Sequence, residues 1–115
     1  MNEVFLEGTV VSITMVEHAA SVKPHCVCQL RVAHRNQKQQ TVSELYTINA
    51  WNRLAAWAAQ ALKSGMRVCV KGYLTQRTQQ SVVVTEVTAN RFVIQQATPP
   101  LPNAVPAQAS IPEIA

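Results

Sequence analysis

The sequence of 115 residues predicts an all-β protein: a closed Greek-key barrel of five strands, with one helix between the third and fourth strands. Two observations predict this class. Most of the chain up to residue 96 alternates apolar and polar residues, which is the period of a half-buried strand. One segment, residues 52–63, instead repeats its apolar residues at helical spacing.

The first three strands are expected at residues 4–13, 26–34 and 42–51. The loops between them are expected at 14–24 and at 35–41, and the second loop is rich in Gln and basic residues. Strand residues two apart share a face, so alternation also predicts which side chains point inward. The expected inward residues are Val4, Leu6, Gly8, Val10, Cys26, Cys28, Leu30 and Val32.

The helix is expected over residues 53–63, with Asn52 as its N-cap and Gly65 just after its end. Its apolar stripe contains Trp57, which is therefore expected in the core. The stripe residues are Leu54, Trp57, Ala58, Ala61 and Leu62.

After the helix the period returns to two. A fourth strand is expected over residues 67–77, with a turn at 78–80. The fifth is expected over 82–87, with residues 91–95 closing the barrel. One helix between strands three and four of such a barrel is the order of the OB-fold.

Residues 51–77 resemble the bacterial and organellar single-stranded DNA-binding proteins, which are OB-folds. Residues 2–8 resemble that family's first strand, and residues 85–87 with 92–94 its last, so the resemblance covers about residues 2–95. The matching residues in the central segment are Trp51, Leu54, Ala55, Ala58, Leu62, Gly65, Val68, Val70, Gly72, Leu74 and Arg77.

The resemblance implies a noncatalytic protein that binds single-stranded DNA in replication and repair. It implies a homo-oligomer, a dimer or tetramer, in the cytoplasm at the nucleoid or in a plastid. The chain resembles a divergent, short member of the family, of a cyanobacterial, plastid or primosomal type. RNA is an open alternative as the ligand.

Charge is consistent with a polyanionic partner. The chain carries ten Lys and Arg, all before residue 92, and no Asp. Five of its six Glu also precede residue 92, so ten cations against five carboxylates give that region a net charge of about +5. No paired carboxylates, P-loop, GxGxxG or GxSxG motif occurs, so no enzyme is expected.

Single-stranded nucleic acid is bound by cations that follow the phosphates and by aromatic rings on which bases stack. Two alternatives stay open: Trp51 could instead pack on the helix start, and Tyr73 could form a cross-strand pair. The candidate contacts are Arg31, Arg35, Lys38, Thr47, Asn49, Trp51, Lys71, Tyr73 and Arg77.

Departures from the family pattern support a second interpretation. His34 or Lys38, Leu45 and Gln79 stand where the family has further aromatics, and the chain ends without an acidic, Phe-ended tip. Recruitment of replication proteins through such a tip is therefore not expected. The alternative is an OB-fold protein-interaction or primosomal accessory subunit in which single-stranded DNA binding is weak or lost.

The three cysteines, Cys26, Cys28 and Cys69, are odd in number and lie in strand patterns. They are expected to be reduced, buried and metal-free, and no cofactor is expected. A metal site that includes His25 is the open alternative. No apolar run is long enough to span a membrane and no signal peptide is expected.

The composition changes after residue 96, where five prolines occur among Ala, Gln and Ser. The expected organisation is an OB-fold domain at 1–96 and a flexible tail at 97–115.

Removal of the tail should leave the domain stable. A chain that ends at Gln96 should keep its free energy of unfolding within about 0.5 kcal/mol, because the tail has little apolar surface to bury. Urea unfolding followed by circular dichroism measures this. A loss above about 2 kcal/mol would mean that the tail packs on the barrel.

Overall fold

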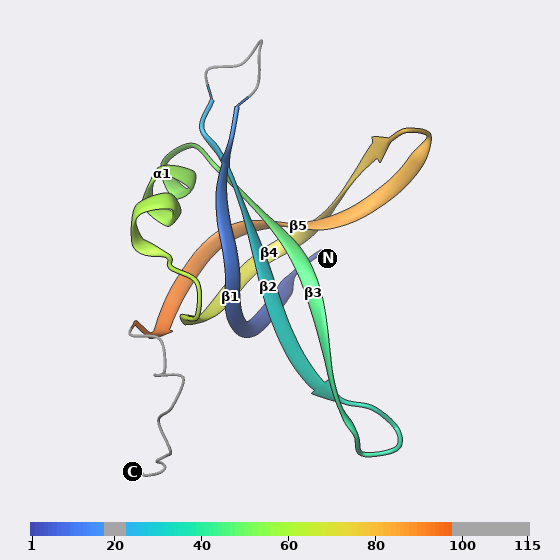
Figure 1. Ribbon diagram of the computed structural model, residues 1–115. Coiled ribbons are helices and arrows are strands. Elements are labelled where there is room, and N and C mark those ends of the chain that lie inside the picture. The colour runs from blue at the N-terminus through green and yellow to red at the C-terminus, as the bar shows by residue number, and fades with distance from the viewer. Residues whose placement is uncertain (18–22, 98–115) are drawn as a thin grey trace.

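The computed structural model describes residues 1–17 and 23–97 of the chain. The elements are β1 (Val4–Val16), β2 (His25–Arg35), β3 (Thr41–Trp51), α1 (Asn52–Ala61), β4 (Arg67–Gln79) and β5 (Val82–Gln96). Five strands close a barrel in the order β1-β2-β3-β5-β4, and α1 lies against one end of it (Figure 1). The predicted OB-fold is confirmed. The predicted tail and the middle of the predicted 14–24 loop lie outside the described residues.

Barrel closure depends on a short contact. All neighbouring strands are antiparallel except β3 and β5, which pair in parallel through Ile48 with Val87 and Asn49 with Thr88. The antiparallel hairpins are much longer. The β2–β3 ladder runs from the pair His25 and Trp51 to the pair Arg35 and Thr41. Both the β2–β3 and the β4–β5 hairpins project from the barrel as arms (Figure 1).

The core follows the predicted alternation of the first strands. Val10, Cys26, Cys28 and Leu30 are buried, and Val4, Leu6 and Val32 pack against them partly buried. Burial raises the pKa of both Cys26 and Cys28, the latter to about 12. Cys69 was expected to be buried as well, and this is wrong: it is half-buried, because it faces outward from β4 between the buried Val68 and Val70.

The helix differs from the prediction at both ends. It begins at Asn52 and ends at Ala61, and no side chain caps its first turn. Asn52 is therefore not a side-chain N-cap. It has a φ of 59°, in the left-handed region that Asn tolerates, and its N–H donates to the Pro24 carbonyl at 2.9 Å.

Trp57 was expected in the core, and the structure shows that it is 40% exposed. The helix packs on the barrel through small residues, Ala55 and Ala58, which bring its backbone close to the strands. A bulky indole does not fit in that contact, so Trp57 lies beside it with its ring centroid 6.1 Å from that of Phe92.

The fifth strand is continuous where two pieces were expected. The β4–β5 ladder passes from Lys71 opposite Arg91 to Gly72 opposite Ala89, which leaves Asn90 as an extra residue on β5. Such a β-bulge bends a strand without ending it. The break in apolar alternation near Asn90 thus marks a bulge.

An amide side chain extends the β1–β4 ladder at the start of the chain. Asn2 Nδ2 donates to the Leu74 carbonyl at 2.9 Å, and the Leu74 N–H donates to Asn2 Oδ1 at 2.9 Å. The side chain thus makes the two bonds that a paired strand residue makes with its backbone.

No helix among residues 1–17 and 23–97 is long and apolar enough to cross a membrane.

Gly72 sits where β4 crosses closely over β5. A Cβ there would lie against the Thr88 carbonyl oxygen and the Ala89 Cα. Because backbone cannot move aside as a side-chain tip can, Gly72→Ala should lower the free energy of unfolding by about 1–3 kcal/mol.

Urea unfolding of Gly72→Ala beside Lys71→Ala checks this. Lys71 is the exposed neighbour on the same strand, so its substitution should change stability by no more than about 0.5 kcal/mol. Equal stabilities of the two variants would show that the strands can separate at Gly72 without cost.

Candidate nucleic-acid interface

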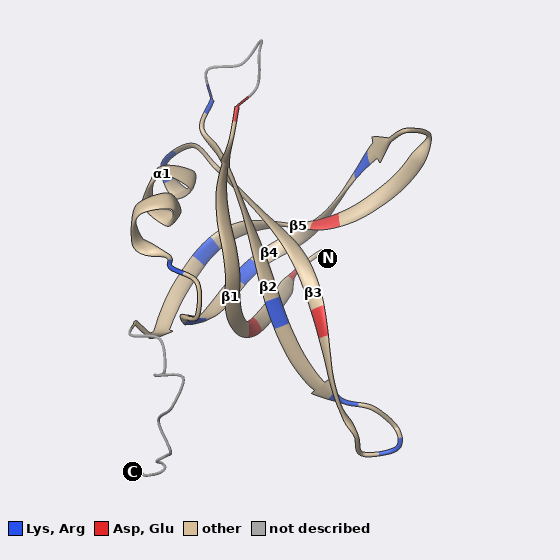
Figure 2. Cartoon of the chain, viewed as in Figure 1, with Lys and Arg blue, Asp and Glu red and all other residues tan. Residues whose placement is uncertain are grey.

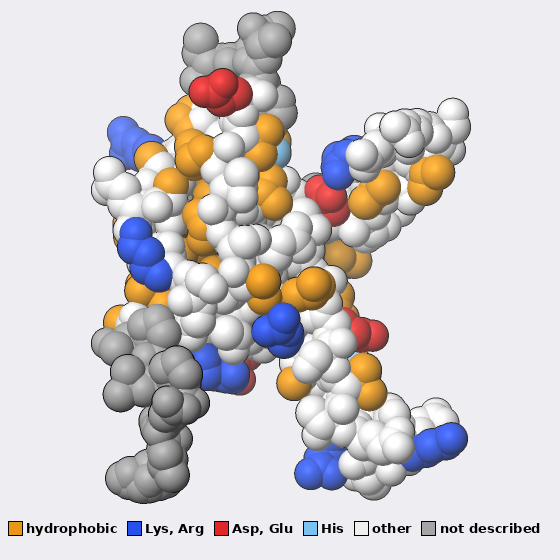
Figure 3. All heavy atoms as spheres, in the orientation of Figure 1, with side chains coloured by type: hydrophobic (Ala, Val, Ile, Leu, Met, Phe, Trp, Pro, Cys, Tyr) orange, Lys and Arg blue, Asp and Glu red, His pale blue; other side chains and the backbone are white. Residues whose placement is uncertain are grey.

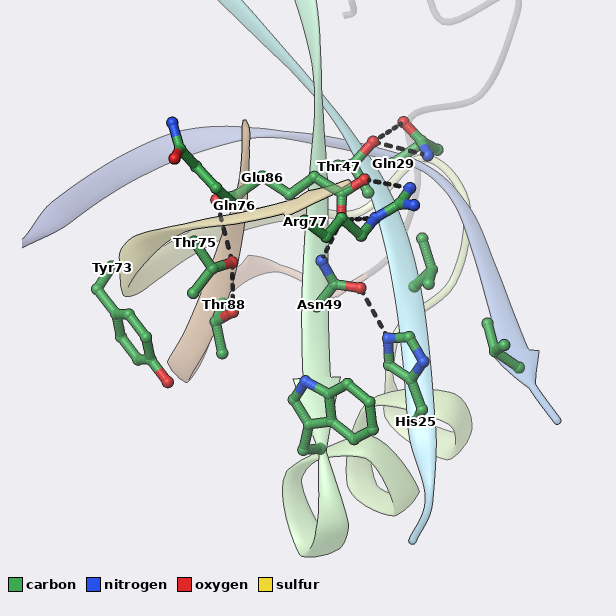
Figure 4. Close-up of a pocket in the computed structure, with 13 residues that line it drawn as sticks. His25, Gln29, Thr47, Asn49, Tyr73, Thr75, Gln76, Arg77, Glu86 and Thr88 are labelled. Carbon is green, nitrogen blue, oxygen red and sulfur yellow. Dashed lines mark hydrogen bonds and ion pairs between the residues drawn. The ribbon is translucent and has the colours of Figure 1, made fainter. Parts of the chain in front are cut away.

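A cavity of about 770 Å³ opens where the two arms leave the barrel (Figure 4). Its lining comes mainly from β2 and β3 on one side and from β4 and β5 on the other, and Val16 at the end of β1 completes it. Five of the nine predicted contact residues line it: Thr47, Asn49, Trp51, Tyr73 and Arg77. The cavity is therefore the candidate site.

The β2–β3 register places one set of predicted residues on a single face. Successive pairs on this face are His25 with Trp51, Val27 with Asn49, and Gln29 with Thr47, and all six line the cavity. Gln29 Nε2 also donates to Thr47 Oγ1 at 3.2 Å.

Three predicted cations continue this face outward along the β2–β3 arm. Arg31 stands opposite Leu45, one pair beyond the cavity, and Arg35 stands opposite Thr41 at the end of the ladder. Lys38 lies in the connecting loop, so cations reach the tip of the arm (Figure 2). None of the three lines the cavity.

On the other side, β4 and β5 supply Tyr73 opposite Thr88 and Thr75 opposite Glu86. Lys71 is two residues from Tyr73 on the same face, but it lies outside the cavity. Its Nζ is 5.8 Å from the centroid of the Phe5 ring, within cation–π range. The structure therefore separates Lys71 from the group around Trp51.

The exposed indole of Trp51 is held by a second ring. The His25 imidazole stacks on it with a centroid separation of 3.9 Å and an interplanar angle of 2°. Trp51 is nevertheless 37% exposed and lines the cavity. It is thus a fixed, flat, partly exposed ring, as a stacking platform for a base must be.

A buried chain of polar side chains continues from His25. His25 Nε2 lies 2.7 Å from Asn49 Oδ1, and Asn49 Nδ2 donates to Glu86 Oε1 at 2.8 Å (Figure 4). The amide nitrogen of Asn49 faces a carboxylate, so its oxygen accepts from His25, and Nε2 of His25 carries a proton. All three residues are buried.

Arg77 completes the chain. Its Nη2 lies 2.9 Å from Glu86 Oε2 and its Nε lies 3.2 Å from Glu86 Oε1, a two-bonded fork. The hydrogen bond from Arg77 lowers the pKa of Glu86, with the Asn49 amide acting in the same direction against the effect of burial. Glu86 is therefore ionised at neutral pH, and the Arg77 charge has a carboxylate beside it.

Sequence reasoning missed several residues that line the cavity, above all His25, Gln29 and Glu86. Alternation placed Gln29 outward on β2, so its face was known but its partner was not. His25 was named as a candidate metal ligand and not among the contacts for nucleic acid. The described residues contain no group of three His, Cys, Asp or Glu that could hold a metal ion.

The cavity lies in a fold shared with several solved structures. A deletion mutant of the single-stranded DNA-binding protein from Thermus aquaticus matches with a TM-score of 0.66 and 19% identity, over 84% of this chain and 51% of that one. This chain thus spans about half the length of the Thermus protein.

Two further structures match at nearly their full length. The SSB domain of a Synechococcus protein matches with a TM-score of 0.63 and 17% identity, over 80% of this chain and 93% of that one. The protein PriB from Ralstonia solanacearum matches with a TM-score of 0.65 and 15% identity, over 84% of this chain and 99% of that one. At these identities the likeness shows the fold.

The sequence matches no curated protein. It does match a family as a whole: residues 1–98 fit the single-strand binding protein family, and this span contains both arms, the cavity and the complete barrel. The chain is a member of the single-strand binding protein family, a family of noncatalytic DNA-binding OB-fold proteins.

Proposed function

We propose that the cavity and the face of the β2–β3 arm form one binding surface for single-stranded DNA. The observation that carries this proposal is the Trp51 ring, which is fixed by His25 yet exposed on the same face as Arg31 and Arg35. A base stacked on Trp51 leaves its phosphates free to follow the arm toward these cations. Tyr73, 36% exposed on the opposite wall, is a second candidate platform.

Charge along the proposed path supports this direction. In the part of the chain that the structure describes, the outer face of the β2–β3 ladder carries no carboxylate, because Glu44 lies on the opposite face beside Val32. Glu44 pairs there with His34 at 3.1 Å. Phosphates that follow the outer face therefore meet Arg31 and Arg35 without a neighbouring negative group on that face.

The finer points of the proposal rest on the family. We propose a homo-oligomer that acts in DNA replication and repair, with residues 1–96 as the binding domain and 97–115 as a flexible tail. The accessory-subunit alternative is favoured by the aromatic residues that the family has and this chain lacks. The experiments below distinguish it from binding of single-stranded DNA.

Replacement of Trp51 should remove stacking and leave phosphate contacts in place. Trp51→Ala should weaken binding of oligo-dT by about 1–3 kcal/mol, while the slope of log affinity against log salt stays nearly the same. Fluorescence anisotropy titrations at several salt concentrations measure both quantities.

Trp57→Ala is the matched control, because Trp57 has nearly the same exposure, 40%, and does not line the cavity. It should bind oligo-dT as the parent protein does. If Trp51→Ala is folded and binds like the parent, the accessory-subunit interpretation takes precedence.

Replacement of Arg31 should show the opposite signature. Arg31→Ala should make the salt slope shallower by about 0.7, the value for one phosphate contact on a single strand, and its affinity loss should shrink as salt rises. Arg53→Ala, which removes an exposed cation from α1, should leave the slope unchanged. Equal slopes for both variants would place the phosphate path elsewhere.

A further inference from the structure

We infer that Arg77 presents the flat face of its guanidinium to a base, as a stacking plane, and does not serve as a cation for a phosphate. This inference rests on the proposed binding of single-stranded DNA and concerns the role of one residue within it. It departs from the ordinary expectation for an arginine in a DNA-binding groove, which is contact with the backbone.

The fork with Glu86 fixes the guanidinium plane. Nε and Nη2 both donate to the same carboxylate, at 3.2 and 2.9 Å, so the two planar groups are joined by two bonds at their edges. Bonds at the edge leave the faces of the guanidinium without hydrogen bonds, and these faces are weakly hydrated. Such a face stacks on bases and aromatic rings.

Glu86 holds its position independently of Arg77. Its side chain is only 9% exposed, and Asn49 Nδ2 donates to it from β3 at 2.8 Å. The carboxylate is thus fixed by the barrel, and Arg77 is fixed by the carboxylate. The Arg77 side chain is itself 53% exposed and lines the cavity, so it is accessible to a ligand there (Figure 4).

The same pair is a poor phosphate site. A phosphate that approaches Arg77 meets a carboxylate oxygen 2.9 Å from Nη2, so attraction to the cation is largely cancelled by repulsion from the anion. A cation that is already neutralised by a carboxylate also neutralises little of the phosphate charge, so it releases few of the counterions condensed on the DNA and contributes little to the salt dependence of binding. Arg31, opposite the apolar Leu45, has no such neighbour across its strand pair.

One network therefore orients two flat groups in one cavity. His25 supports the Trp51 ring, and the chain through Asn49 and Glu86 ends at the Arg77 plane. This gives a further platform to a cavity whose lining, among the described residues, includes only two Phe, Trp or Tyr rings, those of Trp51 and Tyr73. The bases that it accepts need only a flat face, so the site should be tolerant of sequence.

The test compares two ligands of equal length and charge: oligo-dT, and an oligomer whose sugars carry no bases but whose phosphates are intact. Arg77→Lys is the central variant, because lysine keeps the positive charge and its pairing with Glu86 but lacks a planar group. Binding is measured by fluorescence anisotropy at three or more salt concentrations, with urea unfolding as a check on the fold.

Arg77→Lys should bind oligo-dT roughly threefold to thirtyfold more weakly than the parent, with an unchanged salt slope. It should bind the abasic oligomer as the parent does. Arg53→Lys, the same change on the exposed surface of α1, should alter neither affinity.

Two results would overturn the inference. Equal loss on both oligomers, with a shallower slope for Arg77→Ala, would make Arg77 a phosphate contact. Parental affinity of Arg77→Lys for both oligomers would mean that the guanidinium only neutralises Glu86. If instead the parent protein does not bind oligo-dT at any salt concentration, the proposed function fails and the role of Arg77 fails with it, whereas the two results above overturn only the role of Arg77.

A second variant covers loss of folding. If Arg77→Lys does not fold, the double variant Arg77→Met with Glu86→Gln removes the guanidinium plane and both charges together, and avoids an unpaired buried carboxylate. It should lose affinity for oligo-dT and keep that for the abasic oligomer. Parental binding of oligo-dT by a folded double variant would contradict the inference.

Discussion

The buried carboxylate of Glu86 is the constraint on which the arrangement of the site depends. An ionised group in a barrel wall is costly unless charges and hydrogen bonds surround it, and loss of one partner leaves its charge without compensation. Arg77 from β4 and Asn49 from β3 supply those bonds, and Asn49 in turn fixes His25 on β2. One carboxylate on β5 thus positions side chains on β2, β3 and β4.

This network lies where the barrel is held by the fewest backbone contacts. The parallel closure of β3 on β5 consists of two residue pairs, and Asn49 belongs to one of them. Its side chain adds a bond from β3 to Glu86 on β5, next to that closure. β3 and β5 also carry opposite walls of the cavity, so the bond between Asn49 and Glu86 reinforces the barrel and also sets the shape of the binding surface. The two arms diverge from the barrel in Figure 3.

Much of the fold could be predicted because it depends on local periodicity. Alternation placed Val10, Cys28 and Leu30 inward, and the change of period near Trp51 located α1. The errors have physical causes. The position of Trp57 was predicted wrongly because the small residues Ala55 and Ala58 pack α1 closely on the barrel, and a large ring at the edge of this contact stays partly exposed.

The site was less predictable. The sequence of one strand shows on which face a side chain lies, but it does not show which side chain of a neighbouring strand it will contact. The residue types of Trp51 and Tyr73 suggested stacking, and the structure puts both in one cavity. Nothing near Arg77 in the sequence indicates that Glu86 will neutralise it: the two lie nine residues apart on neighbouring strands, and their contact depends on the β4–β5 register. Pairing across strands decides whether an arginine is a free cation.

The cysteines offer a route to observe the protein at work. Cys26 and Cys28 are buried, and burial raises the pKa of each, so neither readily forms the thiolate that reacts with electrophilic dyes. Cys69 alone of the three is half-buried, on the outer face of β4 and four residues from Tyr73, about 13 Å along a strand. A thiol-reactive fluorophore under mild conditions should therefore attach at one position, beside the cavity but outside it, without any engineered residue.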